Sequence, residues 1–168
     1  PGAIARLSPA MDVVRRLAED GGPVLGICNG FQVLCEAGLL PGVLRPNHEG
    51  RFVARDVELR VEQTESAWLP GRLAGDLLRI PIKHHDGAWT APDEIADAVE
   101  SGGQVLLRYV ANPNGSRGAV AAVTNAEGNV LGLMPHPEHA VDALLGSTDG
   151  RTILQGLIAL AERVPLAL

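Results

Sequence analysis

The sequence has no long basic run and no long apolar run, and these two absences exclude broad classes of protein. Its 14 Lys and Arg face 20 Asp and Glu, for a formal net charge of -6 over 168 residues. Such a chain lacks the electrostatic footprint that grips nucleic acid or anionic membranes. No apolar stretch approaches the roughly 20 residues of a membrane-spanning helix, and the first residues lack signal-peptide character. We therefore expect no nucleic acid or membrane partner and a cytoplasmic location.

Cysteine is also scarce, which limits the chemistry that sulfur can do here. Cys28 and Cys35 lie seven positions apart in what reads as one turn and helix, a poor arrangement for a disulfide. Two thiolates are too few for a metal cage of cysteines. At least one of the two is therefore expected to be free for chemistry.

Apolar residues follow both helix and strand periodicity along the chain. With 46% hydrophobic residues, 168 residues suffice for one buried core but are few for two, so residues 1–168 are expected to form a single α/β domain. The patterns predict helices over 8–19, 31–37 and 148–163, and strands over 23–28, 53–61, 105–110, 119–124 and 130–134.

A glycine-flanked cysteine stands where the first predicted strand turns into a helix. Gly26, Cys28 and Gly30 form a Gly-x-Cys-x-Gly pattern, the same device as the strand-to-helix elbow that presents a nucleophilic serine in hydrolases. The helix N-terminus favours a thiolate, and the amide of Asn29 is placed to donate to an oxyanion. The alternative is that Cys28 is a small buried apolar residue, which is how we interpret Cys35.

A histidine and a glutamate follow the last predicted strand. His136 can act as base and acid for a cysteine nucleophile, and Glu138, two residues on, points the same way in extended backbone and can accept the imidazole proton. A water-facing turn is the simpler alternative. Zinc bound by histidines is a rival interpretation, but two prolines prevent the helix that such spacing needs, so we expect no metal. That rival set comprises His84, His85, His136 and His139.

Five segments together resemble a known family. Gly-Ile-Cys-Asn-Gly-Phe-Gln at 26–32 and Met-Pro-His-Pro-Glu at 134–138 are similar to the class I, triad-type glutamine amidotransferases. The sequence of residues 26–32 resembles in particular the glutaminase subunits of phosphoribosylformylglycinamidine synthase (PurQ-like). Residues 46–52, 80–84 and 110–116 are similar to further stretches of that family, so the resemblance runs nearly from end to end.

The resemblance implies a fold, a reaction and a set of roles. The fold would be three-layer α/β and flavodoxin-like, with a mostly parallel central sheet between helices. Cys28 would be the nucleophile, His136 the general base and acid, and Glu138 the partner that orients His136. The residues implied for binding of the glutamine substrate are Asn29, Gln32, Asn47, Arg51 and Phe52.

The same resemblance implies partners. The chain would hydrolyse glutamine to glutamate and ammonia, and pass the ammonia through a tunnel to a PurL-like synthetase subunit, with a small PurS-like bridging subunit. The synthetase would use ATP and Mg to make the amidine in de novo purine biosynthesis, while this chain itself carries no cofactor. Two other functions stay open, namely an amidotransferase subunit of another synthetase and a non-catalytic binding module.

Two departures from the family pattern qualify these expectations. Ile-Lys-His-His-Asp-Gly at 82–87 differs from the family's Pro-Ile-x-His-Gly-Glu-Gly run, so no role is carried over to His84, His85 or Asp86. Family members also begin with a strand, a helix and a Gly-Gly loop that supplies half of the oxyanion hole, and residues 1–6 resemble the sequence just after it. We expect that segment to be missing and the activity of the chain alone to be weak.

Overall fold

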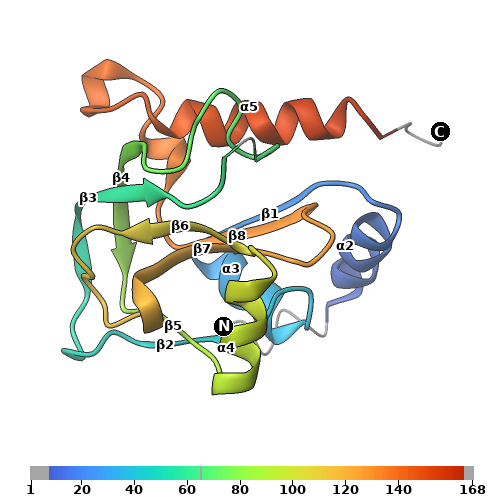
Figure 1. The fold of residues 1–168 in the computed structure, drawn as a ribbon, viewed down its shortest axis with the longest axis horizontal. Helices are drawn as coiled ribbons and strands as arrows, with labels where there is room; N and C mark the ends of the chain where they lie inside the picture. Colours follow the sequence, from blue (N-terminus) through green and yellow to red (C-terminus); the bar gives the residue numbers. More distant parts are fainter. Residues whose placement is uncertain (1–7, 65, 165–168) are drawn as a thin grey trace.

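The computed structural model describes residues 8–64 and 66–164, which form a curled sheet with helices on both faces (Figure 1). The expectations for residues 1–6 lie outside the described residues. The helices are α2 (Pro9–Glu19), α3 (Asn29–Glu36), α4 (Asp93–Ser101) and α5 (Gly150–Ala161), with short 3-10 turns η1 (Arg117–Ala119), η2 (Pro137–His139) and η3 (Ala143–Leu145). The strands are β1 (Val24–Ile27), β2 (Val43–Pro46), β3 (Val53–Val61), β4 (Leu77–His84), β5 (Asp86–Thr90), β6 (Val105–Tyr109), β7 (Val120–Thr124) and β8 (Val130–Leu133).

The main sheet has the strand order β1-β8-β7-β6-β3-β4, and β2 pairs with β5 in a separate ribbon. The three-layer α/β arrangement agrees with the sequence prediction, but the prediction of a mostly parallel sheet is wrong for the described strands. Among them β1 and β8 pair in parallel, and every other pairing is antiparallel. For β7 and β8 the reason is the short connection, because the five residues 125–129 can close a hairpin but cannot make a parallel crossover.

Each face of the sheet has its own buried core, and each core contains one of the two tryptophans. On the α5 side, Trp68 is 1% exposed and donates its indole N–H to the Gly128 carbonyl at 2.8 Å. On the side of α2, α3 and α4, Trp89 is 2% exposed and donates to the Pro41 carbonyl at 3.0 Å. The α5-side core includes Leu59, Leu107, Leu131 and Ile153, and the opposite core includes Phe31, Leu34, Val99 and Val123.

Most of the helices and strands follow directly from local sequence patterns. Ser8 caps α2 by accepting the Ala10 amide, with Pro9 at the first helical position. In β3 the buried Val57, Leu59 and Val61 alternate with exposed residues, which is the period of a strand with one covered face.

Four elements, β2, β4, β5 and α4, were not predicted from the sequence. In β4 the internal Pro81 obscures the strand pattern, and it is tolerated because β4 pairs with β3 alone among the described strands and so forms an edge of the sheet. In α4 only Ala96 and Val99 are buried, which is too short an apolar stripe to recognise.

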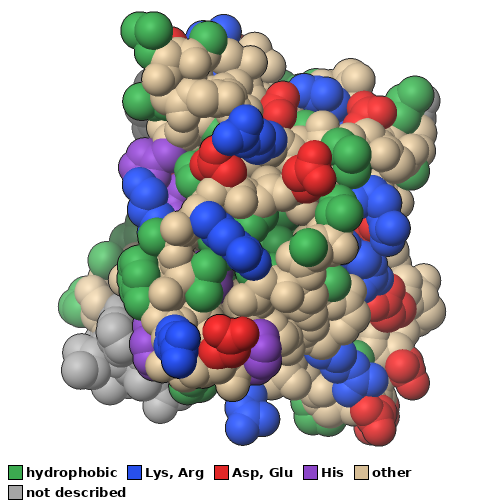
Figure 2. Space-filling model, turned by 90° about the vertical axis from the view of Figure 1, so that its left-hand side faces the viewer, with side chains coloured by type: hydrophobic (Ala, Val, Ile, Leu, Met, Phe, Trp, Pro, Cys, Tyr) green, Lys and Arg blue, Asp and Glu red, His purple; other side chains and the backbone are tan. Residues whose placement is uncertain are grey.

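None of the helices within 8–64 and 66–164 is long and apolar enough to cross a membrane. On the face shown in Figure 2, acidic and basic side chains are interspersed over the surface. The described residues on this face therefore present no extended area of a single charge.

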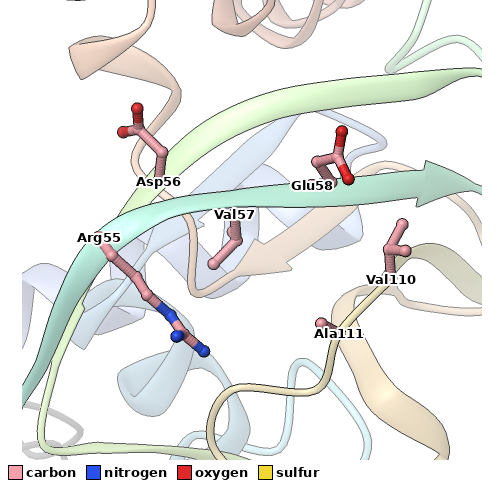
Figure 3. A pocket seen from close by; sticks show the side chains of 6 residues that line it. All are labelled: Arg55, Asp56, Val57, Glu58, Val110 and Ala111. Carbon is pink, nitrogen blue, oxygen red and sulfur yellow. The ribbon is translucent and has the colours of Figure 1, made fainter.

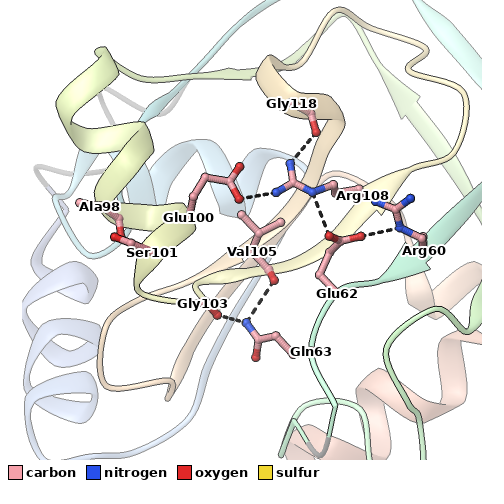
Figure 4. A network of polar contacts seen from close by, with 10 residues as sticks. All are labelled: Arg60, Glu62, Gln63, Ala98, Glu100, Ser101, Gly103, Val105, Arg108 and Gly118. Atoms are coloured by element: carbon pink, nitrogen blue, oxygen red, sulfur yellow. Dashed lines mark hydrogen bonds and ion pairs between the residues drawn. The ribbon is translucent and has the colours of Figure 1, made fainter.

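A half-buried arginine joins four segments of the fold (Figure 4). The Arg108 guanidinium on β6 pairs with Glu62 at 3.1 Å and with Glu100 of α4 at 2.5 Å, and donates to the Gly118 carbonyl at 2.6 Å. Arg60 also pairs with Glu62, at 2.7 Å, but its side chain is 53% exposed whereas that of Arg108 is 15% exposed. The two arginines pair with the same carboxylate and differ in burial, so their substitutions can be compared to measure the effect of burial on an ion pair.

We expect Arg108→Ala to lower the free energy of unfolding by about 2 kcal/mol, because it leaves Glu100 and the Gly118 carbonyl without a charged donor and leaves Glu62 with Arg60 alone. Arg60→Ala is the control and should cost less than about 1 kcal/mol, as exposed ion pairs do. Urea denaturation of both variants measures the difference. Equal costs would show that the depth of burial does not decide the strength of these pairs.

Candidate active site

The junction of β1 and α3 places Cys28 in a backbone conformation that non-glycine residues rarely adopt. Cys28 has φ 53° and ψ -107°, which costs of order 1–3 kcal/mol and needs support from its surroundings. Its amide donates to the Leu133 carbonyl at 2.8 Å, and its carbonyl accepts the Gln32 amide at 3.3 Å. The predicted elbow is therefore present, with the thiol at its apex.

Only one of the two flanking glycines is required by the packing around it. A Cβ on Gly26 would lie 2.5 Å from a Leu34 methyl carbon and 2.8 Å from the Gly30 backbone, so the close contact of β1 with α3 requires glycine there. A Cβ on Gly30 would meet nothing within 4 Å. Contrary to the expectation for a crowded turn, the packing therefore does not require glycine at position 30.

His136 follows β8 and is held by its backbone and by Glu138. Its amide donates to the Pro81 carbonyl at 2.8 Å, and its Nδ1 lies 2.6 Å from Glu138 Oε1. Since a carboxylate only accepts, Nδ1 carries the proton, and in the neutral ring Nε2 is the basic nitrogen. Nε2 is buried and has no hydrogen-bond partner among the described residues. Interaction with the Cys28 side chain, followed by that with Glu138, raises the pKa of His136 against the opposing effect of burial.

Two carbonyls of β4 hold the two reactive side chains together. The Pro81 carbonyl accepts the His136 amide, and the Lys83 carbonyl, two residues on, lies 3.7 Å from the Cys28 sulfur and accepts the thiol. Each of these contacts joins residues 55 apart in the sequence. Sequence reasoning missed them because backbone groups leave no signature in side-chain patterns.

A cavity of about 200 Å³ opens at the thiol. Of the five predicted substrate-binding residues, Asn29, Gln32 and Phe52 line it, whereas Asn47 and Arg51 do not. The remaining lining residues are Cys28, Lys83, His84, His85 and Asp86.

The side chains of Gln32 and Phe52 differ in how they meet this cavity. Gln32 donates its amide to the Asp86 carbonyl at 2.6 Å, which fixes the side chain beside the thiol. Phe52 is 62% exposed, so its ring lies at the rim, where a ligand could cover it.

Asn47 does not line the cavity, but it makes hydrogen bonds to His84, which does. It is 3% exposed, and its amide nitrogen donates to the Arg51 carbonyl at 2.8 Å and to the His84 carbonyl at 3.0 Å. Its amide hydrogens are thus used within the protein, so a direct contact of Asn47 with substrate stays a prediction that this geometry does not favour. Its neighbour His84 is 3% exposed, and burial together with the nearby His136 lowers the pKa of His84 to about 4.

Three side chains of the segment that follows β8 bring possible metal ligands together. His136, Glu138 and His139 have ligand atoms within 4.8 Å of one another, and the two imidazole rings stack at 5.2 Å. The Nδ1 of His136 is already bonded to Glu138, and the Lys83 ammonium lies 3.2 Å from His139 Nδ1, which opposes a second cation. The arrangement therefore suits proton transfer better than metal binding.

Another hollow, of about 250 Å³, lies between β3 and the chain after β6 (Figure 3). Arg55, Asp56 and Glu58 line it together with apolar groups, and Asp56 is paired with Arg79 at 2.5 Å. It contains no nucleophile or base comparable to Cys28 and His136. The cavity at Cys28 is therefore the better candidate for chemistry.

The family model described as a CobB/CobQ-like glutamine amidotransferase domain matches residues 3–153. Among curated relatives, phosphoribosylformylglycinamidine synthase subunit PurQ of Nitrobacter hamburgensis is 47% identical over 171 residues, covering 96% of this chain and 73% of that protein. The subunit of the same name from Lacticaseibacillus casei is 52% identical over 161 residues, covering 96% of this chain and 71% of that protein.

Among solved structures, a chain in the structure of PurLQS from Thermotoga maritima superimposes with a TM-score of 0.85 at 40% identity. The match covers 94% of this chain and 71% of that chain. The similarity in sequence and in fold thus points to the same group of proteins.

The low pKa of His84 predicts a loss of stability in acid. Above pH 6.5 the ring is neutral in both folded and unfolded chains, whereas between pH 6.5 and about 4 only the unfolded chain gains the proton. We expect this to remove about 3 kcal/mol of unfolding free energy across that window. Urea denaturation at a series of pH values should show a shallower fall for His84→Asn than for the unaltered protein, and parallel curves would contradict this assignment.

Glu138→Gln should lower the pKa of His136, because it removes the carboxylate that stabilises the protonated ring. An NMR titration of the His136 imidazole measures the shift directly. Glu49→Gln is the control, since Glu49 contacts the exposed His48 at 3.7 Å and should leave His136 unchanged. An unshifted His136 in Glu138→Gln would mean that the 2.6 Å contact does not persist in solution.

Proposed function

This chain belongs to the CobB/CobQ-like glutamine amidotransferase family, among its PurQ subunits, and on that premise we propose that it hydrolyses glutamine with Cys28, His136 and Glu138. The observation that carries the proposal is the strained backbone of Cys28, φ 53°, in the lining of a cavity, together with the interaction of His136 with both the Cys28 side chain and Glu138. A conformation that costs free energy in a small cavity is typical of a functional position.

The reaction begins with attack of the Cys28 sulfur on the carbon of the glutamine side-chain carbonyl. Loss of the thiol proton to His136 gives the thiolate, and the raised pKa of His136 favours this ion pair. The carbonyl oxygen becomes an oxyanion, for which the Asn29 amide at the start of α3 is the proposed donor.

Collapse of the tetrahedral intermediate breaks the carbon-nitrogen bond. His136 gives its proton to the departing nitrogen, ammonia leaves, and a glutamyl thioester remains on Cys28. Water then attacks the thioester with His136 as base, which releases glutamate and restores the thiol. Throughout, Glu138 keeps the Nδ1 proton of His136 in place, so that Nε2 is the nitrogen that exchanges the proton.

The proposed destination of the ammonia is phosphoribosylformylglycinamidine synthase of purine biosynthesis. The relatives from Nitrobacter hamburgensis and Lacticaseibacillus casei are subunits of that enzyme by name, and the Thermotoga maritima relative was solved as PurLQS. We therefore propose a PurL-like synthetase subunit and a small PurS-like subunit as partners, with ATP and Mg²⁺ bound by the synthetase. Two free cysteines suit the reducing cytoplasm that the proposal assigns to the protein.

The test compares the two cysteines of the full-length gene product in complex with its synthetase partner. A diazo-ketone analogue of glutamine should label Cys28, and free glutamine should protect it. Cys28→Ala should abolish both labelling and ammonia release. The matched control is Cys35→Ala, which should keep both activities because Cys35 is 8% exposed and burial raises its pKa to about 12.

Two results would contradict the proposal. Ammonia release that survives Cys28→Ala would exclude the thiol as the nucleophile. Labelling that glutamine cannot block would indicate a reactive cysteine in a module that does not bind this substrate.

A further inference from the structure

His84 lies in the wall of the Cys28 cavity, and the proposed mechanism gives it no part. It is the last residue of β4, 3% exposed, and its ring lies against the backbone of Gly87. A Cβ on Gly87 would lie 2.3 Å from His84 Nδ1, so the ring can occupy this place only beside a glycine. The position of the imidazole is therefore tightly determined.

The hydrogen bonds of Asn47 determine which ring nitrogen of His84 carries the proton. Asn47 Nδ2 donates to two carbonyl oxygens, those of Arg51 and His84, so the orientation of the amide is fixed. Asn47 Oδ1, an acceptor, then faces His84 Nδ1 at 3.0 Å. Nδ1 must therefore be the donor, and in the neutral ring Nε2 carries only a lone pair.

This lone pair is buried without a partner. Burial, with the charge of His136, lowers the pKa of His84 to about 4, so the ring is neutral at physiological pH. Nε2 has no hydrogen-bond partner among the described residues. Buried acceptors are rarely left unpaired, so a donor that the described residues do not supply is expected at Nε2.

The chemistry of the substrate supplies such a donor. The carboxamide of glutamine carries two N–H groups on the nitrogen that leaves, whereas the carboxylate of glutamate carries none. We propose that His84 Nε2 accepts one N–H of the glutamine carboxamide and thereby holds the leaving nitrogen beside Cys28. This inference rests on the proposed function, since it concerns the same cavity and the same substrate.

The consequence is selectivity between substrate and product. Once the nitrogen has left, the lone pair of His84 would face the lone pairs of the glutamate carboxylate, which is repulsive. His84 thus acts as a specificity-determining residue that favours glutamine and promotes release of glutamate.

Two substitutions separate the two nitrogens of His84. The amide of Asn can replace the N–H of Nδ1 and keep the bond to Asn47, but it has no atom at the position of Nε2. The longer Gln can place a carbonyl oxygen near the position of Nε2. We expect His84→Asn to lower kcat/KM for glutamine roughly tenfold and to strengthen inhibition by glutamate, with His84→Gln retaining most of the activity.

The diazo-ketone analogue provides the internal reference, because it has no N–H on the group that meets Cys28. In the full-length protein with its synthetase partner, His84→Asn should label Cys28 within about twofold of the unaltered rate. Expressing glutamine turnover per labelled Cys28 also cancels any loss of folded protein.

Each remaining outcome overturns a specific statement. Normal turnover in His84→Asn with loss in His84→Gln would mean that only the bond from Nδ1 to Asn47 matters. Labelling and turnover that fall together would mean that His84 acts on the thiol or on the shape of the cavity, or that a buried water takes up Nε2. Failure of Cys28 to label in the unaltered protein would instead overturn the proposed function.

Discussion

The hydrogen bond from the Cys28 amide to the Leu133 carbonyl, 2.8 Å long, is the contact on which the site depends. It continues the parallel pairing of β1 with β8 by one step beyond the strand, so the nucleophile and the segment that carries His136 leave the sheet at the same level. A parallel pair brings two carboxyl ends together, which an antiparallel pair cannot do. Although the described sheet is otherwise antiparallel, its parallel pair is the one that builds the site.

The edge strand β4 then completes the cavity from outside. The carbonyls of Pro81 and Lys83 accept hydrogen bonds from His136 and Cys28. The side chains of the alternate residues Ile80 and Ile82 are fully buried in the α5-side core. Rigidity at the reactive groups therefore comes from the same strand that seals the core. These contacts supply the support from the surrounding structure that a strained backbone conformation needs.

Local sequence patterns predicted the reactive side chains. Contacts between residues far apart in the sequence determine the cavity wall and the strand pairing around them. The elbow at Cys28 and the pair of His136 and Glu138 each lie within five residues of sequence, so their geometry could be derived from turn and strand periodicity. Asn47 was expected to contact substrate, yet its hydrogen-bonding groups meet Arg51 and His84. The mostly parallel sheet was an implication of the family resemblance, although Asn, Gly and Asn within 125–129 are residue types of a hairpin turn and favour an antiparallel pair there.

The two buried tryptophans lie in different layers of the molecule, Trp68 on the α5 side of the sheet and Trp89 on the side of α2, α3 and α4. Because the chain has no other tryptophan, its tryptophan fluorescence is the sum of one reporter from each layer. Replacing either indole with phenylalanine would leave a single emitter that follows one face of the sheet. The molecule thus contains a built-in spectroscopic means of observing whether its two cores melt together or in turn.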